Sequence, residues 1–322
     1  MKQATGKSIV IIGGGVIGLS TAFHLARRGA QVTVIDRAAP GGAATGASFA
    51  WINAASMNGS EDYYRLRLQG MFEYQRLERD IGLPVKHGGR LEWRDDLGEL
   101  AQECATLAGL GYGVQWLSRD EISALEPALR DPPESAVFTE LESSVDPVEM
   151  TACLVAAAEK LGVEFLPNSA VRGLIVENGS VRGVAVESGA LAVDCVVLAA
   201  GADSQALAAT VNLRLPMVNS SGMVIHTTPV PPLLGRVILM SRLHMKQDLS
   251  GRMVAAWDSA GGQVTQDSER DGERLLVMIG SLLRTEAPLI LDDITIGMCP
   301  EPEDGFPVVG FALALKNLYV TV

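Results

Sequence analysis

Positive charge is scarce in this sequence of 322 residues. Lysine and arginine together number 26, against 38 aspartates and glutamates, which gives a formal net charge of −12 at pH 7. A field of this sign repels phosphate backbones and anionic lipid surfaces. The charge balance therefore argues against nucleic acid as a partner.

Cysteine is also scarce. The four residues, Cys104, Cys153, Cys195 and Cys299, lie far apart and form no CxxC pair or Cys/His ligand spacing. The sequence suggests neither a disulfide framework nor a zinc site, and no metal is expected. Reduced thiols of this kind predict a cytoplasmic protein; a position peripheral to the inner membrane is also left open.

One strongly apolar, uncharged run lies near the start of the sequence. Ser8 to Ala26 contains no acidic or basic residue apart from His24 and has the length of a membrane span or signal sequence. Its four glycines and its fit to a strand, a turn and a helix predict a buried element of a soluble domain instead. No integral membrane segment is expected, and His24 is read as an ordinary helical residue.

Internal repeats and low-complexity tracts are absent as well. The composition is globular, with 48% apolar residues and 34 glycines. A chain of this length exceeds one ordinary core and predicts one large α/β domain or two interleaved ones.

The first forty residues contain a strand, a glycine turn, a helix and a second strand. Ile9–Ile12 reads as a buried parallel strand, Gly13–Gly18 fits GxGxxG, a helix follows up to Gly29, and the next strand, QVTVID, ends in Asp36. This is the full context of a dinucleotide-binding fingerprint.

Each position of the fingerprint has a physical reason. Gly13 permits the tight turn, Gly15 lets the backbone approach a pyrophosphate, and Gly18 lets helix and strand pack closely. The helix N-terminus offers N–H groups and partial positive charge to phosphates. Asp36 would accept hydrogen bonds from ribose hydroxyls.

A stretch rich in small residues, RAAPGGAATGASFAWINAASMNGS, follows Asp36 where a simple NAD-binding domain would continue with regular strands and helices. Small residues allow the backbone to lie flat against a large ligand. The alternative is a flexible linker, but the FAWIN cluster requires burial.

With these motifs the sequence resembles the D-amino acid oxidase and glycine oxidase family of FAD-dependent oxidoreductases. The resemblance covers nearly the whole chain and includes the GGAATGAS loop, SVDP at Ser144 to Pro147, LAAGADS and the DGFPVVG turn, in order. It implies FAD, bound non-covalently, rather than NAD. The expected cofactor contacts are Gly13, Gly15, Val16, Ile17, Gly18, Asp36, Arg37, Ala44, Thr45, Ser48, Val171, Ala200 and Gly201; an ordinary buried valine remains an alternative for Val171.

The expected fold is α/β, with a Rossmann-like, glutathione-reductase-like FAD-binding domain and an inserted antiparallel-sheet substrate domain. Residues 1–84, 145–214 and 292–322 form the first, and residues 85–144 and 215–291 the second. We expect a helix from Tyr63 to about Ile81, a helix beginning at Pro147 and a three-strand antiparallel meander from VRGLIV to LAVDCVVLAAG. GMVIHTT, RMVAAWD and RLLVMIGS are expected as strands of the second domain.

The resemblance implies that a neutral amine or amino acid loses hydride from its α-carbon to flavin N5, giving an imine that water hydrolyses, with oxygen as electron acceptor. Two alternatives stay open: a dehydrogenase-type subunit that passes electrons to a quinone or partner protein, and a flavin-poor, inactive binding protein. The sequence does not determine whether copies of the chain associate.

Three residues are candidates for the substrate side. Cys299 occupies the position of an arginine that pairs with the substrate carboxylate in glycine oxidase-like relatives. Either another cation such as Arg284, Arg242 or Lys246 substitutes, or the substrate is not a simple α-amino acid. A covalent flavin is rejected because the anchoring cysteine of sarcosine oxidases falls on Gly297, and a small buried cysteine is the plainest interpretation.

The other two candidates are His244 and Trp51. His244 corresponds to a substrate-contacting tyrosine of the family, with a surface strand histidine as the alternative. Trp51 corresponds to a loop residue beside the reactive face of the flavin, with a core aromatic as the alternative.

In the family, a Gly/His/Ser-rich turn and a helix pointing at the flavin pyrimidine follow a strand like NLYV. The sequence stops before such a segment, so the resemblance implies weaker flavin affinity and slower reduction.

Overall fold

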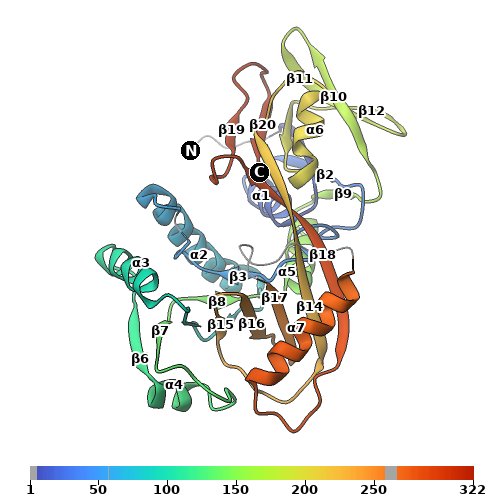
Figure 1. The fold of residues 1–322 in the computed structure, drawn as a ribbon. Coiled ribbons are helices and arrows are strands. Elements are labelled where there is room, and N and C mark those ends of the chain that lie inside the picture. The colour runs from blue at the N-terminus through green and yellow to red at the C-terminus, as the bar shows by residue number, and fades with distance from the viewer. Residues whose placement is uncertain (1–5, 57, 258–266) are drawn as a thin grey trace. The chain divides into compact units, whose positions relative to one another are not determined.

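The computed structural model describes residues 6–56, 58–257 and 267–322 and divides into two compact units (Figure 1). Unit 1 comprises residues 1–46, 147–220 and 297–322, and unit 2 comprises residues 47–146 and 221–296. The strands β14 (Met217–Pro229) and β18 (Leu291–Pro302) each cross from one unit to the other along the chain. Both units are therefore discontinuous in sequence.

Unit 1 contains a six-stranded sheet with the order β19-β20-β13-β1-β2-β9. The strands are β1 (Ser8–Ile12), β2 (Gln31–Ile35), β9 (Glu164–Leu166), β13 (Cys195–Leu198), β19 (Val309–Phe311) and β20 (Leu318–Thr321). All neighbouring pairs are parallel except β19 with β20. Nearly continuous apolar strands such as IVII suit a parallel sheet covered on both faces.

The two faces of this sheet have different cover. Ile11 lies against Gly18 of α1 (Val16–Ala26), which packs with α5 (Pro147–Glu159). Val10 and Ile12 share a core cluster with the antiparallel meander of β10 (Val171–Glu177), β11 (Ser180–Val186) and β12 (Gly189–Ala192). Both the meander and the helix start at Pro147 are confirmed.

The predicted third strand of the meander, LAVDCVVLAAG, is too long. The structure ends β12 at Ala192 and begins β13 at Cys195. Asp194 between them accepts hydrogen bonds from the Ser8 backbone N–H at 2.9 Å and from its hydroxyl at 3.0 Å. This contact fixes the turn that takes the chain from the meander into the parallel sheet. The short η1 (Gly201–Asp203) and α6 (Ser204–Ala209) follow β13.

Unit 2 is built on the sheet β18-β14-β17-β16-β15-β5-β7-β6. Its other strands are β5 (Arg90–Glu92), β6 (Gln115–Ser118), β7 (Ser135–Thr139), β15 (Val237–Leu239), β16 (Leu243–Gln247) and β17 (Arg252–Trp257). β5 pairs with β15 in parallel, whereas the β14–β17, β15–β16, β16–β17, β5–β7 and β6–β7 pairs are antiparallel.

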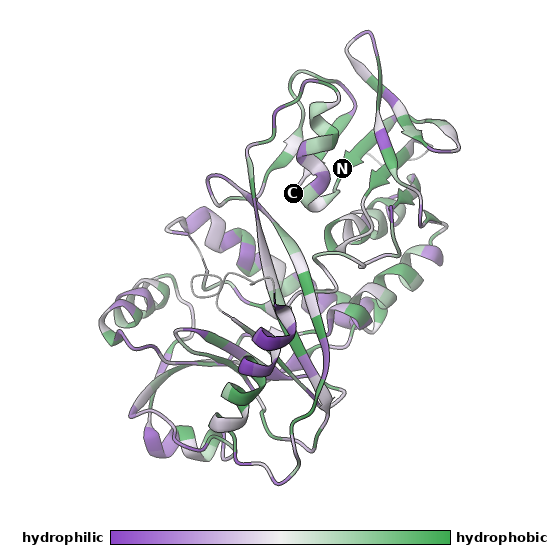
Figure 2. Ribbon diagram, turned by 45° about the vertical axis from the view of Figure 1, so that its right-hand side comes forward, coloured by the Kyte–Doolittle hydropathy of each residue, from purple (hydrophilic) through white to green (hydrophobic). Residues whose placement is uncertain are grey.

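The prediction of a strand at RLLVMIGS was wrong, because these residues belong to helix α7 (Ser268–Leu282). Asp267 caps the helix by accepting from the Arg270 N–H at 3.1 Å. Leu275 and Ile279, one turn apart, are fully buried in the core cluster of the sheet, whereas Val277 is 71% exposed. In Figure 2 both purple, hydrophilic residues and green, hydrophobic residues occur within single helices, as amphipathic helices require.

The rest of unit 2 comprises a small sheet and three helices. The sheet has the order β3-β8-β4, with β3 (Trp51–Ile52), β8 (Ser143–Ser144) and β4 (Lys86–His87). The helices are α2 (Glu61–Ile81), α3 (Leu97–Gly109), which Asp96 caps, and α4 (Arg119–Leu125). Residues 47–84, expected with the nucleotide domain, lie in unit 2 because β3 pairs with β8 and Tyr64 of α2 packs on Tyr112.

Candidate functional site

The glycine turn of unit 1 can be built only with glycine at two positions. Gly13 has φ +109, and a Cβ there would lie 2.2 Å from the Ala199 carbonyl oxygen. A Cβ on Gly18 would lie 1.9 Å from the Gly13 carbonyl oxygen, because α1 packs directly on the turn. Both glycines therefore serve the close packing of β1, α1 and the segment after β13.

Gly15 is different, because its backbone suits any residue. Its φ of −76 and ψ of 177 are ordinary extended values, and a Cβ there would meet only Thr45 Oγ1, at 3.0 Å, within 4 Å. Thr45 also accepts a hydrogen bond from the Val16 N–H at 3.0 Å. Val16 and the exposed Ile17 open helix α1, whose N-cap Gly15 supplies no side-chain cap. Room and partial positive charge thus coincide at Gly15.

Asp36 lies at the end of β2 and is tied to the same turn. Its Oδ2 accepts from the Gly14 N–H at 2.6 Å and its Oδ1 from the Ala38 N–H at 2.8 Å. Each carboxylate oxygen keeps capacity for a further donor. The neighbouring Arg37 is exposed and forms an ion pair with Asp203 of η1 at 2.9 Å.

The small-residue loop folds back on the glycine turn. The Gly41 N–H donates to the Gly14 carbonyl at 2.8 Å, and the Gly46 N–H to the Gly41 carbonyl at 2.8 Å. Gly41 has φ +77, and a Cβ there would lie 2.7 Å from the Thr151 hydroxyl oxygen. The loop carries the half-buried Ala44 and Thr45 to the start of α1.

Ala200 and Gly201 are two more expected cofactor contacts, and they directly follow Ala199. The Ala199 N–H donates to the Ile12 carbonyl at 2.9 Å. Val171, the first residue of β10, packs against the core cluster of the sheet and meander. Ser48 lies in unit 2, where its hydroxyl accepts from the Ala50 N–H at 3.0 Å. The structure thus gathers most of the expected cofactor residues around one turn.

Cys299 is an exposed free cysteine on β18, before the DGFPVVG turn, so its interpretation as a small buried cysteine was wrong. Asp304 shapes that turn by accepting from the Phe306 N–H at 3.0 Å, and Gly305 adopts φ +73. All four cysteines are free, so no disulfide occurs in the part of the chain that the structure describes.

The three cations considered in place of an arginine at position 299 have other surroundings. Arg284 donates to the Arg130 carbonyl at 2.6 Å beyond the end of α7, and Arg242 is exposed in the turn from β15 to β16. Lys246 is only 2% exposed and donates to the carbonyl oxygens of Ala50 and Val145 at 3.3 Å and 2.9 Å.

Trp51 and His244, two of the expected substrate-side residues, lie together in unit 2. His244 is on β16, and its ring centroid lies 6.3 Å from that of Trp51, edge to face, and 5.9 Å from that of Phe49. Phe49 also packs against Val224, Val254 and Ala256 of the sheet. Aromatic rings and one imidazole therefore cover this part of the sheet.

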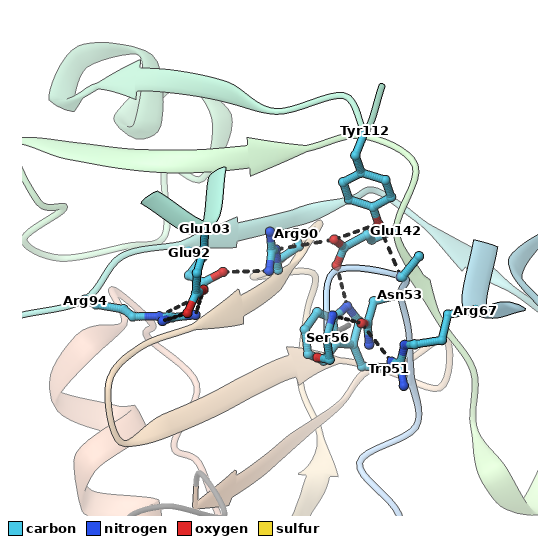
Figure 3. A network of polar contacts seen from close by, with 11 residues as sticks. Trp51, Asn53, Ser56, Arg67, Arg90, Glu92, Arg94, Glu103, Tyr112 and Glu142 are labelled. Atoms are coloured by element: carbon cyan, nitrogen blue, oxygen red, sulfur yellow. Dashed lines mark hydrogen bonds and ion pairs between the residues drawn. The ribbon is translucent and has the colours of Figure 1, made fainter. Parts of the chain in front are cut away.

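A buried carboxylate holds Trp51 (Figure 3). The indole Nε1 donates to Glu142 Oε2 at 2.6 Å, and the Tyr112 hydroxyl donates to Glu142 Oε1 at 2.9 Å. Arg90 forms an ion pair with Glu142 at 3.5 Å, and its guanidinium lies 5.6 Å from the centroid of the Trp51 ring. Desolvation raises the pKa of Glu142, and the Arg90 charge opposes that rise.

The charges continue from Arg90 toward the surface. Arg90 pairs with Glu92 at 2.6 Å, Arg94 donates to the other oxygen of Glu92 at 2.6 Å, and Arg94 also pairs with Glu103 at 2.8 Å. Glu103 is about half exposed, whereas the side chains of Arg90 and Glu92 are 4% exposed. Charge alternates along this chain of side chains, as buried ions require.

Little in the sequence indicates this network of charges. Arg90 and Glu92 flank Leu91 in a short strand in which polar and apolar residues alternate. Glu142 follows directly after a turn. The sequence suggests Lys246 only as a candidate anchor for a carboxylate. A lysine within the buried strand LHMKQ signals the separate contacts with the Ala50 and Val145 carbonyls, because a buried amine needs partners.

Residues 8–322 match the family model described as "FAD dependent oxidoreductase". The chain is 31% identical to "Uncharacterized oxidoreductase YurR" of Bacillus subtilis over 344 residues, covering 97% of this chain and 88% of the relative. It is 26% identical to "Glycine oxidase" of Bacillus licheniformis, covering 94% of this chain and 83% of that protein.

Among solved structures, glycine oxidase from Geobacillus kaustophilus superposes with a TM-score of 0.87 at 23% identity, covering 98% of this chain and 89% of that one. This likeness shows the fold, and it confirms the predicted fold class. Among the described residues, no helix combines the length and apolar character needed to cross a membrane, and no group of three or more His, Cys, Asp or Glu side chains could hold a metal ion.

Proposed function

Because the chain belongs to the FAD-dependent oxidoreductase family that its residues 8–322 match, we propose that it oxidises the C–N bond of an amine or amino acid to an imine and passes the electrons to oxygen. That it is an FAD-dependent oxidoreductase acting on amine or amino-acid donors follows from the family and from its glycine oxidase relatives. What we propose beyond this is that the product is an imine and that oxygen is the electron acceptor.

The glycine turn is the observation that carries the proposal, since its residues fit FAD. Gly15 leaves space on an unstrained backbone beside the N-terminus of α1, and Asp36 stands 2.6 Å from the Gly14 N–H with acceptor capacity left. A pyrophosphate at Gly15 and a ribose at Asp36 would use these features. We assign non-covalent cofactor contacts to the residues expected from the sequence, including Arg37, Ala44, Ser48, Val171, Ala200 and Gly201.

When bound, FAD supplies the two-electron acceptor for the substrate hydride. The protein must bind a neutral amine, orient its α-hydrogen and exclude water. We assign the orienting and shielding roles to Trp51 and His244, whose rings lie 6.3 Å apart in an aromatic part of the sheet. An indole provides a flat apolar wall, and an imidazole can donate a hydrogen bond to the substrate.

Substrate preference follows from Cys299. A thiol cannot form the two parallel hydrogen bonds with which an arginine holds a carboxylate. Lys246 is buried and bound to two backbone carbonyls, so we do not assign it that role. We propose that the preferred substrate is an amine, or an amino acid whose carboxylate is not held at position 299.

The test is an anaerobic panel of primary and secondary amines and of D- and L-amino acids, followed by loss of the flavin absorbance. Bleaching by at least one amine, with hydrogen peroxide formed after oxygen is admitted, supports the proposal. Bleaching without peroxide would overturn oxygen as the acceptor and favour a quinone or a partner protein. A preparation that binds FAD and is bleached by no member of the panel would contradict amine oxidation.

A further inference from the structure

Trp51 is anchored through both its backbone and its side chain. It begins β3, where it pairs with Ser144 of β8, and its indole N–H bonds at 2.6 Å to Glu142, two residues earlier in the chain than Ser144 (Figure 3). Backbone and side chain are thus held by the same neighbouring segment. The ring is still only half-buried, so part of it remains available for contact.

Burying the carboxylate of Glu142, which anchors Trp51, carries a desolvation cost. Its side chain is fully buried, with 0% exposure, and an unpaired carboxylate in such a place would cost several kcal/mol. An ion pair with Arg90 offsets this cost. The buried charge of Arg90 is itself paired with Glu92, and Glu92 is paired with Arg94. Apolar side chains would fill the same space without these charges. Two aromatic side chains donate hydrogen bonds to Glu142, Tyr112 through its hydroxyl and Trp51 through its indole N–H.

The residue before Trp51 is held as well. Ala50 has φ +52, a left-handed conformation that costs a non-glycine residue about 1 kcal/mol or more. Its carbonyl accepts from the Val145 N–H at 3.2 Å and from the buried Lys246 ammonium at 3.3 Å. Lys246 also lies 5.2 Å from the centroid of the Phe49 ring. A strained backbone with two buried donors fixes the direction in which Trp51 leaves the chain.

We propose that Glu142 is a positioning residue that sets the plane of the Trp51 indole, with Arg90 holding the carboxylate in place. Its consequence for catalysis rests on the proposed function, in which Trp51 forms a wall of the substrate site. Loss of Glu142 frees the ring to rotate, and a loosely placed wall binds and orients the substrate less well. Misplacement of about 1 Å can lower a catalytic rate by roughly 100-fold.

The test uses the full chain labelled with 5-fluorotryptophan. Its four tryptophans then give separate ¹⁹F resonances. Trp51→Phe identifies the resonance of Trp51. In Glu142→Leu we expect that resonance to move by more than its linewidth or to broaden, in the presence and in the absence of FAD. Glu142→Gln keeps an acceptor for the indole and should restore most of the original position.

Glu126→Leu is the matched control. Glu126 is a carboxylate of the same unit, 1% exposed, which accepts from the Gly235 N–H at 3.0 Å and pairs with Arg236. Its loss should lower stability by a similar amount and leave the Trp51 resonance where it was. If Glu142→Leu does not fold, Tyr112→Phe removes one donor from Glu142 without touching Trp51, and a smaller shift in the same direction is expected.

A Trp51 resonance that Glu142→Leu does not move, or that Glu126→Leu moves equally, would overturn the inference. Turnover of the best amine from the panel separates the two proposals: kcat/KM should fall about 10- to 100-fold in Glu142→Leu and recover in Glu142→Gln. If the resonance moves and kcat/KM does not, Glu142 positions Trp51, and the assignment of Trp51 to the substrate site is what fails.

Discussion

Replacing Gly15 by alanine should separate the fold of the glycine turn from its capacity to bind FAD. The backbone at Gly15 has φ −76 and ψ 177, which alanine adopts without strain. The new methyl group would meet Thr45 Oγ1 at 3.0 Å and otherwise enter open space within 4 Å. We therefore expect the apoprotein to fold and FAD binding to suffer.

The two effects differ in size. Alanine is a poorer N-cap than glycine and crowds one hydroxyl, so the free energy of unfolding of the apoprotein should fall by only about 1 kcal/mol or less. A methyl group in the space meant for a pyrophosphate costs about 1–3 kcal/mol, as overpacking does elsewhere. Since about 1.4 kcal/mol is tenfold in affinity, the Kd for FAD should rise roughly 10- to 100-fold.

The assay pairs urea unfolding of the apoprotein with titration of FAD, followed by quenching of its fluorescence. Gly70→Ala is the matched control, because Gly70 lies within α2 with nothing within 4 Å of its added Cβ. That substitution should stabilise the helix by about 0.5–1 kcal/mol and leave FAD affinity unchanged. Gly13→Ala should prevent the turn from forming, given φ +109 and a 2.2 Å approach to the Ala199 carbonyl.

One result would refute the reasoning. If Gly15→Ala binds FAD as tightly as Gly70→Ala does, while its apoprotein is folded, the pyrophosphate does not approach the backbone at Gly15. The placement of the cofactor on this turn would then have to be abandoned.

Four further predictions can be tested. Asp36→Ala should weaken FAD binding about tenfold or more, by loss of a charged acceptor, and an unchanged titration would refute the ribose role. Because burial lowers the pKa of Lys246 from 10.5 to about 8, the unfolded state retains this proton longer. The unfolding free energy should therefore rise by about 3 kcal/mol from pH 8 to 10.5 through this residue, and Lys246→Met should lack that rise in pH-dependent urea unfolding; equal slopes would contradict it. Cys299→Arg should raise kcat/KM for small α-amino acids if a carboxylate anchor is lacking, and no change across D- and L-forms would count against that. Leu275→Ala should cost about 2–5 kcal/mol in urea unfolding, whereas a neutral effect would deny α7 its place over the sheet core.

The sequence was most informative where structure is local. The glycine turn, α1 and Asp36 lie within thirty-odd consecutive residues, and each is constrained by backbone sterics that a motif reveals. The fold class followed because the remaining motifs occur in order along the chain.

The anchoring of Trp51 could not be predicted, because its partners are distant in sequence. Glu142 is 91 residues from Trp51, and Lys246 is 196 residues from Ala50. A single sequence gives no sign that an acidic residue at a turn will be fully buried. Only the folded sheet, with Arg90 beside it, makes that burial tolerable.

The error at RLLVMIGS has a similar cause. Leu275, Leu276, Val277, Met278 and Ile279 are all apolar, so the run fits either a strand or one face of a helix. The Asp267 cap and the burial of Leu275 with Ile279, while Val277 faces solvent, decide for the helix. The limit of β12 likewise depends on the contact of Asp194 with Ser8, 186 residues away.

The place of β20 in the parallel sheet has a consequence for biosynthesis. This strand, Leu318–Thr321, is an interior member that pairs with β13 on one side and β19 on the other, whereas β1 and the glycine turn precede it by some three hundred residues. During translation the turn must therefore wait for some three hundred residues before its sheet is whole. A nascent chain halted ahead of β20 would present the unpaired backbone edge of β13 as a template for pairing with other strands.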